Sequence, residues 1–253
     1  MAFDPRNRAR AYAVGQTVER ADIDVGLRQY MLRIYNYMTT GLAISGLVAW
    51  TVANVPAVTG IFYTMQGGQI VGINGLGMIA MWAPLIMLIG AMFLMRSPSA
   101  SGAQIFYWLF VAVNGIGLSI LMLVYTSESL IRTFFITAAA FAALSLWGYT
   151  TKKNLSGFGS FLMMGLVGLI IVSIVNMFFF SSMLQFVISA AGVLIFAGLT
   201  AYQTQKLKDQ YVNLASGQGE AVQTVTAVFG ALLLYITFIN LFQFLMMFLG
   251  QRQ

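Results

Sequence analysis

The sequence predicts an all-α, polytopic membrane protein with seven transmembrane helices. Hydrophobic residues make up 59% of the 253 residues and charged residues only 8%, whereas a soluble domain carries about 25% charged residues. The apolar residues fall into seven runs, each close to the roughly 20 residues that a helix needs to cross about 30 Å of hydrocarbon. A globular core could not hide this much apolar surface, so we expect the chain to lie in a lipid bilayer.

A polar segment precedes the first run. Residues 1–29 contain several arginines and lack the apolar stretch of a signal peptide, so we expect a polar cytoplasmic N-terminal tail. Residues 30–253 then form one seven-helix transmembrane domain. The predicted spans are Ile34–Asn54, Leu76–Met95, Ala103–Tyr125, Leu130–Tyr149, Phe158–Phe180, Met183–Lys206 and Val225–Leu249.

The breaks between spans carry turn-forming or polar residues. Because these breaks are short, consecutive helices are expected to be antiparallel neighbours. Residues 55–75 are Gly-rich and uncharged; we expect a passive connector, with packing over the mouth of the bundle as the alternative. At Ser181-Ser182 two runs almost fuse, and the alternative there is one long helix. No internal repeat is visible, which argues against an inverted-repeat transporter.

The positions of Lys and Arg predict the direction of the spans. Eleven of the 13 basic residues lie in the N-terminal region and in the breaks after the second, fourth and sixth spans, whereas Arg132 and Arg252 lie on the other side. The positive-inside rule then places the N-terminus in the cytoplasm and the C-terminus outside. Since the basic residues are scattered over short loops and not gathered on one face, a nucleic-acid partner is excluded.

The residue types exclude most membrane-enzyme chemistries. The chain has no His and no Cys, which removes zinc metalloprotease sites, Ser–His pairs and disulfides. None of the seven acidic residues lies deep inside a span, so the facing aspartates of an intramembrane protease are not available. All four lysines lie at span ends, which excludes a retinal Schiff base inside the bundle. We therefore expect no enzymatic activity, no cofactor and no metal site.

Small and polar residues recur on one face of each of the last two spans. Because polar side chains in a span face the bundle interior, the two stripes are expected to face each other or a shared cavity, with simple helix packing as the alternative. The stripes consist of Gln185, Ser189, Gly192, Thr200 and Gln203 in the sixth span, and Thr226, Gly230, Thr237 and Asn240 in the seventh. Asn176 in the fifth span and Asn114 in the third are further candidates to line such a cavity.

Four segments carry motifs of a known family. They are Gly26–Met31 before the first span, Tyr149–Ser156 after the fourth, Gly198–Lys206 at the end of the sixth and Leu234–Phe242 in the seventh. In these segments the chain resembles the bacterial branch of the Bax inhibitor family, the transmembrane BAX-inhibitor-motif proteins. The resemblance covers nearly the whole chain from Gly26 and implies a multi-pass protein of the cell inner membrane.

The resemblance also implies a pH-sensitive calcium leak channel. In the family pattern the sixth and seventh spans supply two facing aspartates that share protons, and a basic residue ending the second span pairs with one of them and holds the pore shut. The basic position matches Arg96, but the aspartate positions fall on Gln203 and Thr237, and a third falls on Asn154. A neutral pair neither attracts a divalent cation strongly nor titrates. Natural divergence and deliberate replacement both account for this pattern.

Two functions follow as expectations. The first is a passive leak for calcium or other cations that lacks the pH gate, lined by Gln203, Thr237 and Asn240 with Arg96 near the cytoplasmic mouth. The second is a non-conducting, stress-response modulator that binds a membrane protease or another membrane partner through the polar N-terminal tail.

Overall fold

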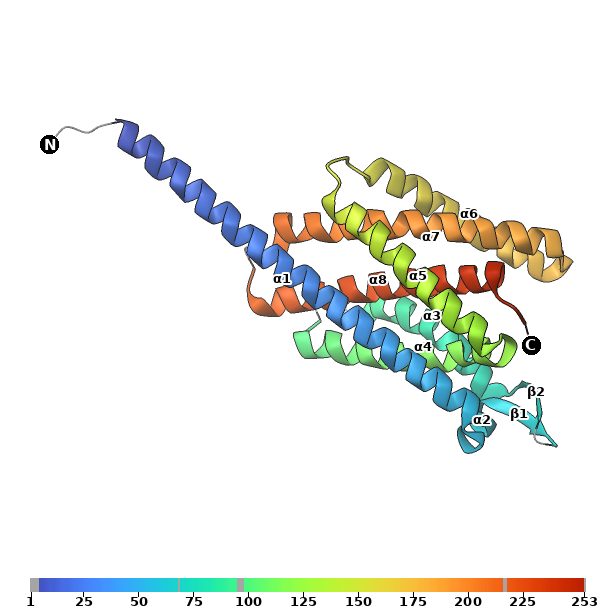
Figure 1. Ribbon diagram of the computed structural model, residues 1–253. Coiled ribbons are helices and arrows are strands. Elements are labelled where there is room, and N and C mark those ends of the chain that lie inside the picture. The colour runs from blue at the N-terminus through green and yellow to red at the C-terminus, as the bar shows by residue number, and fades with distance from the viewer. Residues whose placement is uncertain (1–4, 68, 95–97, 216–217, 253) are drawn as a thin grey trace.

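The computed structural model describes the backbone of residues 5–67, 69–94, 98–215 and 218–252, with side chains for 24–67, 69–93, 98–213 and 218–252. The elements in chain order are α1 (Pro5–Asn54), α2 (Pro56–Phe62), β1 (Tyr63–Gln66), β2 (Gln69–Ile73), α3 (Gly75–Leu94), α4 (Ala100–Val124), α5 (Ser127–Thr150), α6 (Ser156–Phe179), α7 (Ser182–Gln210), a π-helical turn η1 (Tyr211–Ala215) and α8 (Glu220–Leu249). Figure 1 shows these helices as one elongated bundle.

The structure confirms an all-α polytopic membrane fold. Each of the helices α3 to α8 is long and apolar enough to cross a bilayer by itself, and α1 with α2 forms a further bent pair, for up to seven spans. The two helices of that pair meet at an angle of 95°. The bend lies at Val55, whose extended backbone (φ −100°, ψ 106°) is what the following proline requires, because the Pro56 ring disfavours helical geometry in the residue before it.

The described part of the N-terminal region is helical and continuous with the first predicted span. Helix α1 begins at Pro5 and continues without a break to Asn54, and Figure 1 shows its first part projecting beyond the bundle. No proline lies between Pro5 and Pro56 to stop a helix. The first predicted span is therefore the C-terminal part of a longer helix.

The prediction of a passive connector over residues 55–75 is wrong. This segment forms α2 and an antiparallel hairpin of β1 and β2, with Gly67 at φ 59° in the turn, where a residue without Cβ adopts the left-handed conformation at little cost. The Tyr63 hydroxyl lies 2.8 Å from Oγ of Ser119 on α4. The hairpin is thus fixed to the bundle.

Helix α8 lies at the centre of the bundle. It packs against α1, α4, α5 and α7, whereas α3 packs on α4 and α6 packs on α7. The helices α6 and α7 are separate, since Phe180 between them has a left-handed backbone (φ 48°), and the alternative of one long helix is wrong. Figure 1 places the α5–α6 connection, with Lys152 and Lys153, at the same end of the bundle as the α7–α8 connection, and the hairpin at the other end.

Candidate functional site

Gln203 on α7 and Thr237 on α8 face each other where the two helices pack together. The Thr237 hydroxyl donates a hydrogen bond to Oε1 of Gln203, and it also lies 2.9 Å from the carbonyl oxygen of Leu233 in its own helix. A hydroxyl carries one proton, so it donates to one of these two acceptors at a time. Only 8% of Gln203 and 1% of Thr237 is exposed. The pair is a buried, neutral contact between two spans.

The other members of the two polar stripes make different contacts. The Thr200 hydroxyl donates to the Phe196 carbonyl, and Nδ2 of Asn240 donates to the Ile236 carbonyl. Both bonds stay within one helix. The structure therefore brings Gln203 and Thr237 together but does not join Thr200 or Asn240 to them by hydrogen bonds.

The remaining predicted site residues lie elsewhere. Nδ2 of Asn114 donates to the Tyr235 hydroxyl over 2.8 Å, on the face of α8 away from Thr237, because residues two apart in a helix point in different directions. Nδ2 of Asn176 donates to Oε1 of Gln185 over 3.1 Å. This contact is far from the pair, because Gln185 precedes Gln203 by 18 residues, or roughly 27 Å of helix. The hydrogen bonds described for the two asparagines do not reach the pair. Arg96 lies outside the described residues.

A polar groove opens between the end of α7 and the start of α8. This α7–α8 groove has a volume of about 750 Å³, and its lining includes Gln205, Lys206, Asp209 and Thr226. It reaches Leu233, whose carbonyl oxygen is the second acceptor beside the Thr237 hydroxyl. Among the described residues neither member of the pair lines the groove, so the pair lies just beyond its inner end.

Gln205 is a buried anchor that the sequence reasoning did not single out. Its Oε1 accepts a hydrogen bond from the Leu155 amide and its Nε2 donates to the Lys153 carbonyl, each over 2.8 Å. It thereby fixes the α5–α6 connection to α7. In the same connection, Oδ1 of Asn154 accepts from the Ser156 amide over 2.9 Å. Asn154, which precedes the N-cap residue Leu155, therefore satisfies the first amide of α6 without a charge.

A chain of hydroxyls connects α1, α5 and α7. The Tyr35 hydroxyl lies 2.6 Å from Oγ of Ser145, which lies 2.9 Å from Oγ1 of Thr204. Thr204 donates to the Thr200 carbonyl, so Ser145 donates to Thr204 and Tyr35 donates to Ser145. Thr204 follows Gln203 directly, and the chain therefore ends beside the buried pair.

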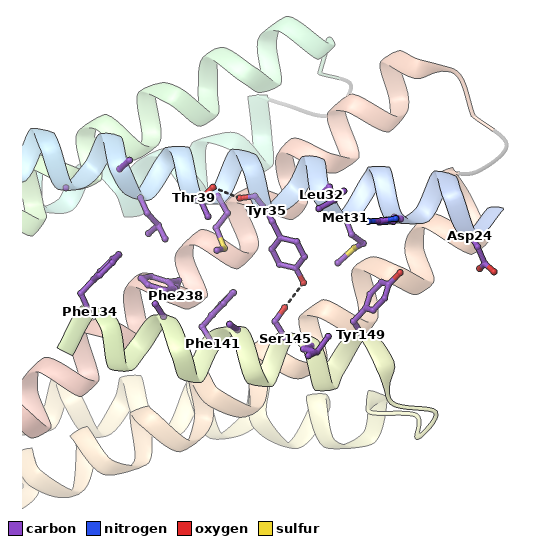
Figure 2. A pocket seen from close by; sticks show the side chains of 18 residues that line it. Asp24, Met31, Leu32, Tyr35, Thr39, Phe134, Phe141, Ser145, Tyr149 and Phe238 are labelled. Atoms are coloured by element: carbon purple, nitrogen blue, oxygen red, sulfur yellow. Dashed lines mark hydrogen bonds between the residues drawn. The ribbon is translucent and has the colours of Figure 1, made fainter. Parts of the chain in front are cut away.

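A second, apolar groove lies between α1 and α5. This α1–α5 groove has a volume of about 1020 Å³. Figure 2 shows Tyr35 reaching from α1 to Ser145 on α5 across the groove, with Phe134 and Phe238 toward one end and Asp24 and Tyr149 at the other.

The buried Gln203–Thr237 pair offers polar oxygens and no charge. Amide and hydroxyl oxygens are weak, neutral ligands for a hard cation such as Ca²⁺. Within the described residues, no three His, Cys, Asp or Glu side chains come together in a way that could hold a metal ion. The pair can therefore contact a cation only through neutral oxygens.

Comparison with known proteins gives consistent matches over almost the whole chain. The family model described as "Inhibitor of apoptosis-promoting Bax1" matches residues 27–253. An uncharacterized protein of Caulobacter vibrioides is 49% identical over 95% of this chain and 96% of its own length. The inner membrane protein YbhL of Escherichia coli K12 is 38% identical over 90% of this chain and 94% of its own length. A protein of Rickettsia prowazekii is 40% identical over 94% of this chain and 95% of its own length.

Proposed function

The chain belongs to the Bax inhibitor family, and we propose that it is a passive leak channel for calcium and other cations whose pathway runs between α7 and α8. The resemblance read from the sequence motifs is confirmed, and the protein is a multi-pass protein of the inner membrane. The observation that carries the proposal is the buried contact of Gln203 with Thr237 beyond the inner end of a polar groove.

The α7–α8 groove supports a pathway that ends at the pair. Asp209 in its lining offers carboxylate oxygens to an entering cation. The pair itself is almost completely buried and is bonded from helix to helix, so it blocks the inner end of the groove. The arrangement is that of a closed channel, and opening requires α7 and α8 to separate at the pair.

Gln203 and Thr237 stand where the family pattern has aspartates, and this difference should change how the pathway responds to pH. A carboxylate pair changes its charge with pH, whereas an amide and a hydroxyl keep the same charge at every physiological pH. A buried charge within a span also costs about 2.5–3.5 kcal/mol on insertion scales, and the neutral pair avoids this cost. We therefore propose that the leak is independent of pH and that calcium is held weakly in the pathway.

Calcium flux from loaded liposomes tests the proposal. Calcium-loaded liposomes that contain the purified protein should release calcium faster than calcium-loaded liposomes without protein. The variants Gln203→Leu and Thr237→Val should reduce the flux, because an apolar contact in place of the polar one repels a hydrated ion. Thr137→Val is the matched control, because Thr137 is fully buried on α5 and, among the described residues, its hydroxyl bonds to the Thr133 carbonyl alone. Flux no greater than that of empty vesicles contradicts the channel function.

The projecting part of α1 favours a second candidate, a non-conducting modulator of a membrane protease or another membrane partner. Helix α1 extends well beyond the bundle as one element (Figure 1), and a helix without neighbours is free to bind another protein. Deletion of residues 1–26 separates the two candidates. A modulator that works through this segment loses its partner in co-purification, whereas a leak persists.

A further inference from the structure

We propose that the α1–α5 groove binds an anionic phospholipid of the surrounding bilayer, with an acyl chain along its apolar walls and the phosphate beside Arg28. The inference does not depend on ion conduction. It rests on the shape of the groove, on the distribution of charge along it and on its place in a membrane protein.

The groove has the dimensions of an acyl-chain site. Its volume of about 1020 Å³ lies at the upper end of the roughly 300–1000 Å³ typical of ligand pockets. On α5 its lining runs from Phe134 to Tyr149, which is roughly 22 Å of helix and exceeds the roughly 15 Å of hydrocarbon in one leaflet. One acyl chain therefore fits within the length of the groove.

The walls are apolar and are held apart. Ala43 and Gly46 on α1 face Ala138 and Ala142 on α5 across the groove, and such small residues ordinarily let two helices approach closely. Here the two helices leave a space between them, with Phe141 among the residues that line it (Figure 2). Inside a bilayer this space is open to lipid chains and not to water.

Among the described residues that line the groove, the charged ones lie at one end. Arg28 lines that end, and no side chain among those described forms an ion pair or hydrogen bond with its guanidinium. Tyr149 also lines this end of the groove. Nζ of Lys208 donates to the Tyr149 carbonyl over 2.9 Å and lies 5.3 Å from the centroid of the Tyr149 ring. Asp24 is the one acid in the lining, four residues before Arg28. Among the described lining residues Arg28 and Asp24 balance in charge, and Lys208 beside the lining adds a positive charge that suits an anionic head group.

Native mass spectrometry tests this site on the full-length protein. The protein is extracted in mild detergent from vesicles that contain equal amounts of phosphatidylglycerol and phosphatidylcholine. We expect retained phosphatidylglycerol to exceed phosphatidylcholine, and Arg28→Gln to lower that preference about fivefold, the effect of one basic residue near a membrane surface. Asp24→Asn should raise the preference. Lys153→Gln is the control, since Lys153 is exposed at the same end but lies outside the groove lining.

A matched pair of variants tests the acyl-chain part of the site. Ala142→Phe places a ring inside the groove and should remove bound lipid of both head groups. Ala143→Phe adds the same ring at the next residue, which is exposed and does not line the groove, and should retain the lipid. The proposal is overturned if Arg28→Gln behaves like Lys153→Gln, if the two phenylalanine variants retain equal lipid, or if Ala142→Phe abolishes a dimer, which would identify the occupant as a second copy of the chain.

Discussion

Replacing Gln205 by leucine should destabilise the protein through the loss of two specific hydrogen bonds. The Leu155 amide lies in a residue that is only 6% exposed, and a buried donor without a partner costs about 1–3 kcal/mol. Lys153 is exposed, so water can replace the bond to its carbonyl, and that loss costs about 0.5–1 kcal/mol. Together the two losses should lower the free energy of unfolding by about 3 kcal/mol. For a chain of this size the midpoint of thermal unfolding should then fall by about 6–12 °C.

The assay is thermal unfolding of the purified protein in micelles, followed by intrinsic fluorescence. Gln210→Leu is the matched control, because Gln210 lies in the last turn of α7 and its side chain has no hydrogen bond to any described residue. Amide hydrogen exchange should also become faster at Leu155 in the Gln205 variant alone. The reasoning is refuted if the two leucine variants unfold within about 2 °C of each other.

Two further changes test the contacts between helices by the same thermal assay. Tyr35→Phe removes the hydroxyl bonded to Ser145. Since an interhelical bond is worth about 0.6–2 kcal/mol, the midpoint of thermal unfolding should fall by about 1–8 °C, and an unchanged midpoint contradicts the assigned bond. Gly148→Ala should lower the free energy of unfolding by about 1–3 kcal/mol, because the added Cβ overlaps the Ala201 carbonyl. In the control Gly168→Ala the added Cβ points into open space, so the free energy of unfolding should rise by up to about 1 kcal/mol from helix propensity. Shifts of the same sign in the two glycine variants would show that α5 and α7 do not approach closely at Gly148.

The sequence predicts the helices and one contact of the site well, because both depend on periodic patterns. The lengths of the apolar runs locate α3 to α8, and the spacing of polar residues in the last two spans places Gln203 and Thr237 on facing sides. The contact between these two residues follows from the structure, while its role as a gate remains a proposal.

Features that depend on distant partners could not be predicted in this way. Tyr35 and Ser145 are 110 residues apart, and nothing in either apolar run marks one as the partner of the other. Gln205 lies inside a recognised motif, but its two partners belong to a connection whose path the sequence does not specify. The hairpin, in contrast, has a local sequence signal, since Gln66-Gly67-Gly68 lies between two short segments of strand-forming residues. The many glycines of this segment favour a loop, and this is why the hairpin is missed.

The pH dependence of calcium flux in liposomes tests the central claim most directly. The unmodified protein should leak at the same rate from about pH 5.5 to pH 8, because neither Gln203 nor Thr237 changes its charge in this range. The double variant Gln203→Asp, Thr237→Asp should leak at a rate that changes with pH, because a carboxylate pair shares protons. A pH-dependent leak in the unmodified protein, or a pH-independent leak in the double variant, would contradict the account.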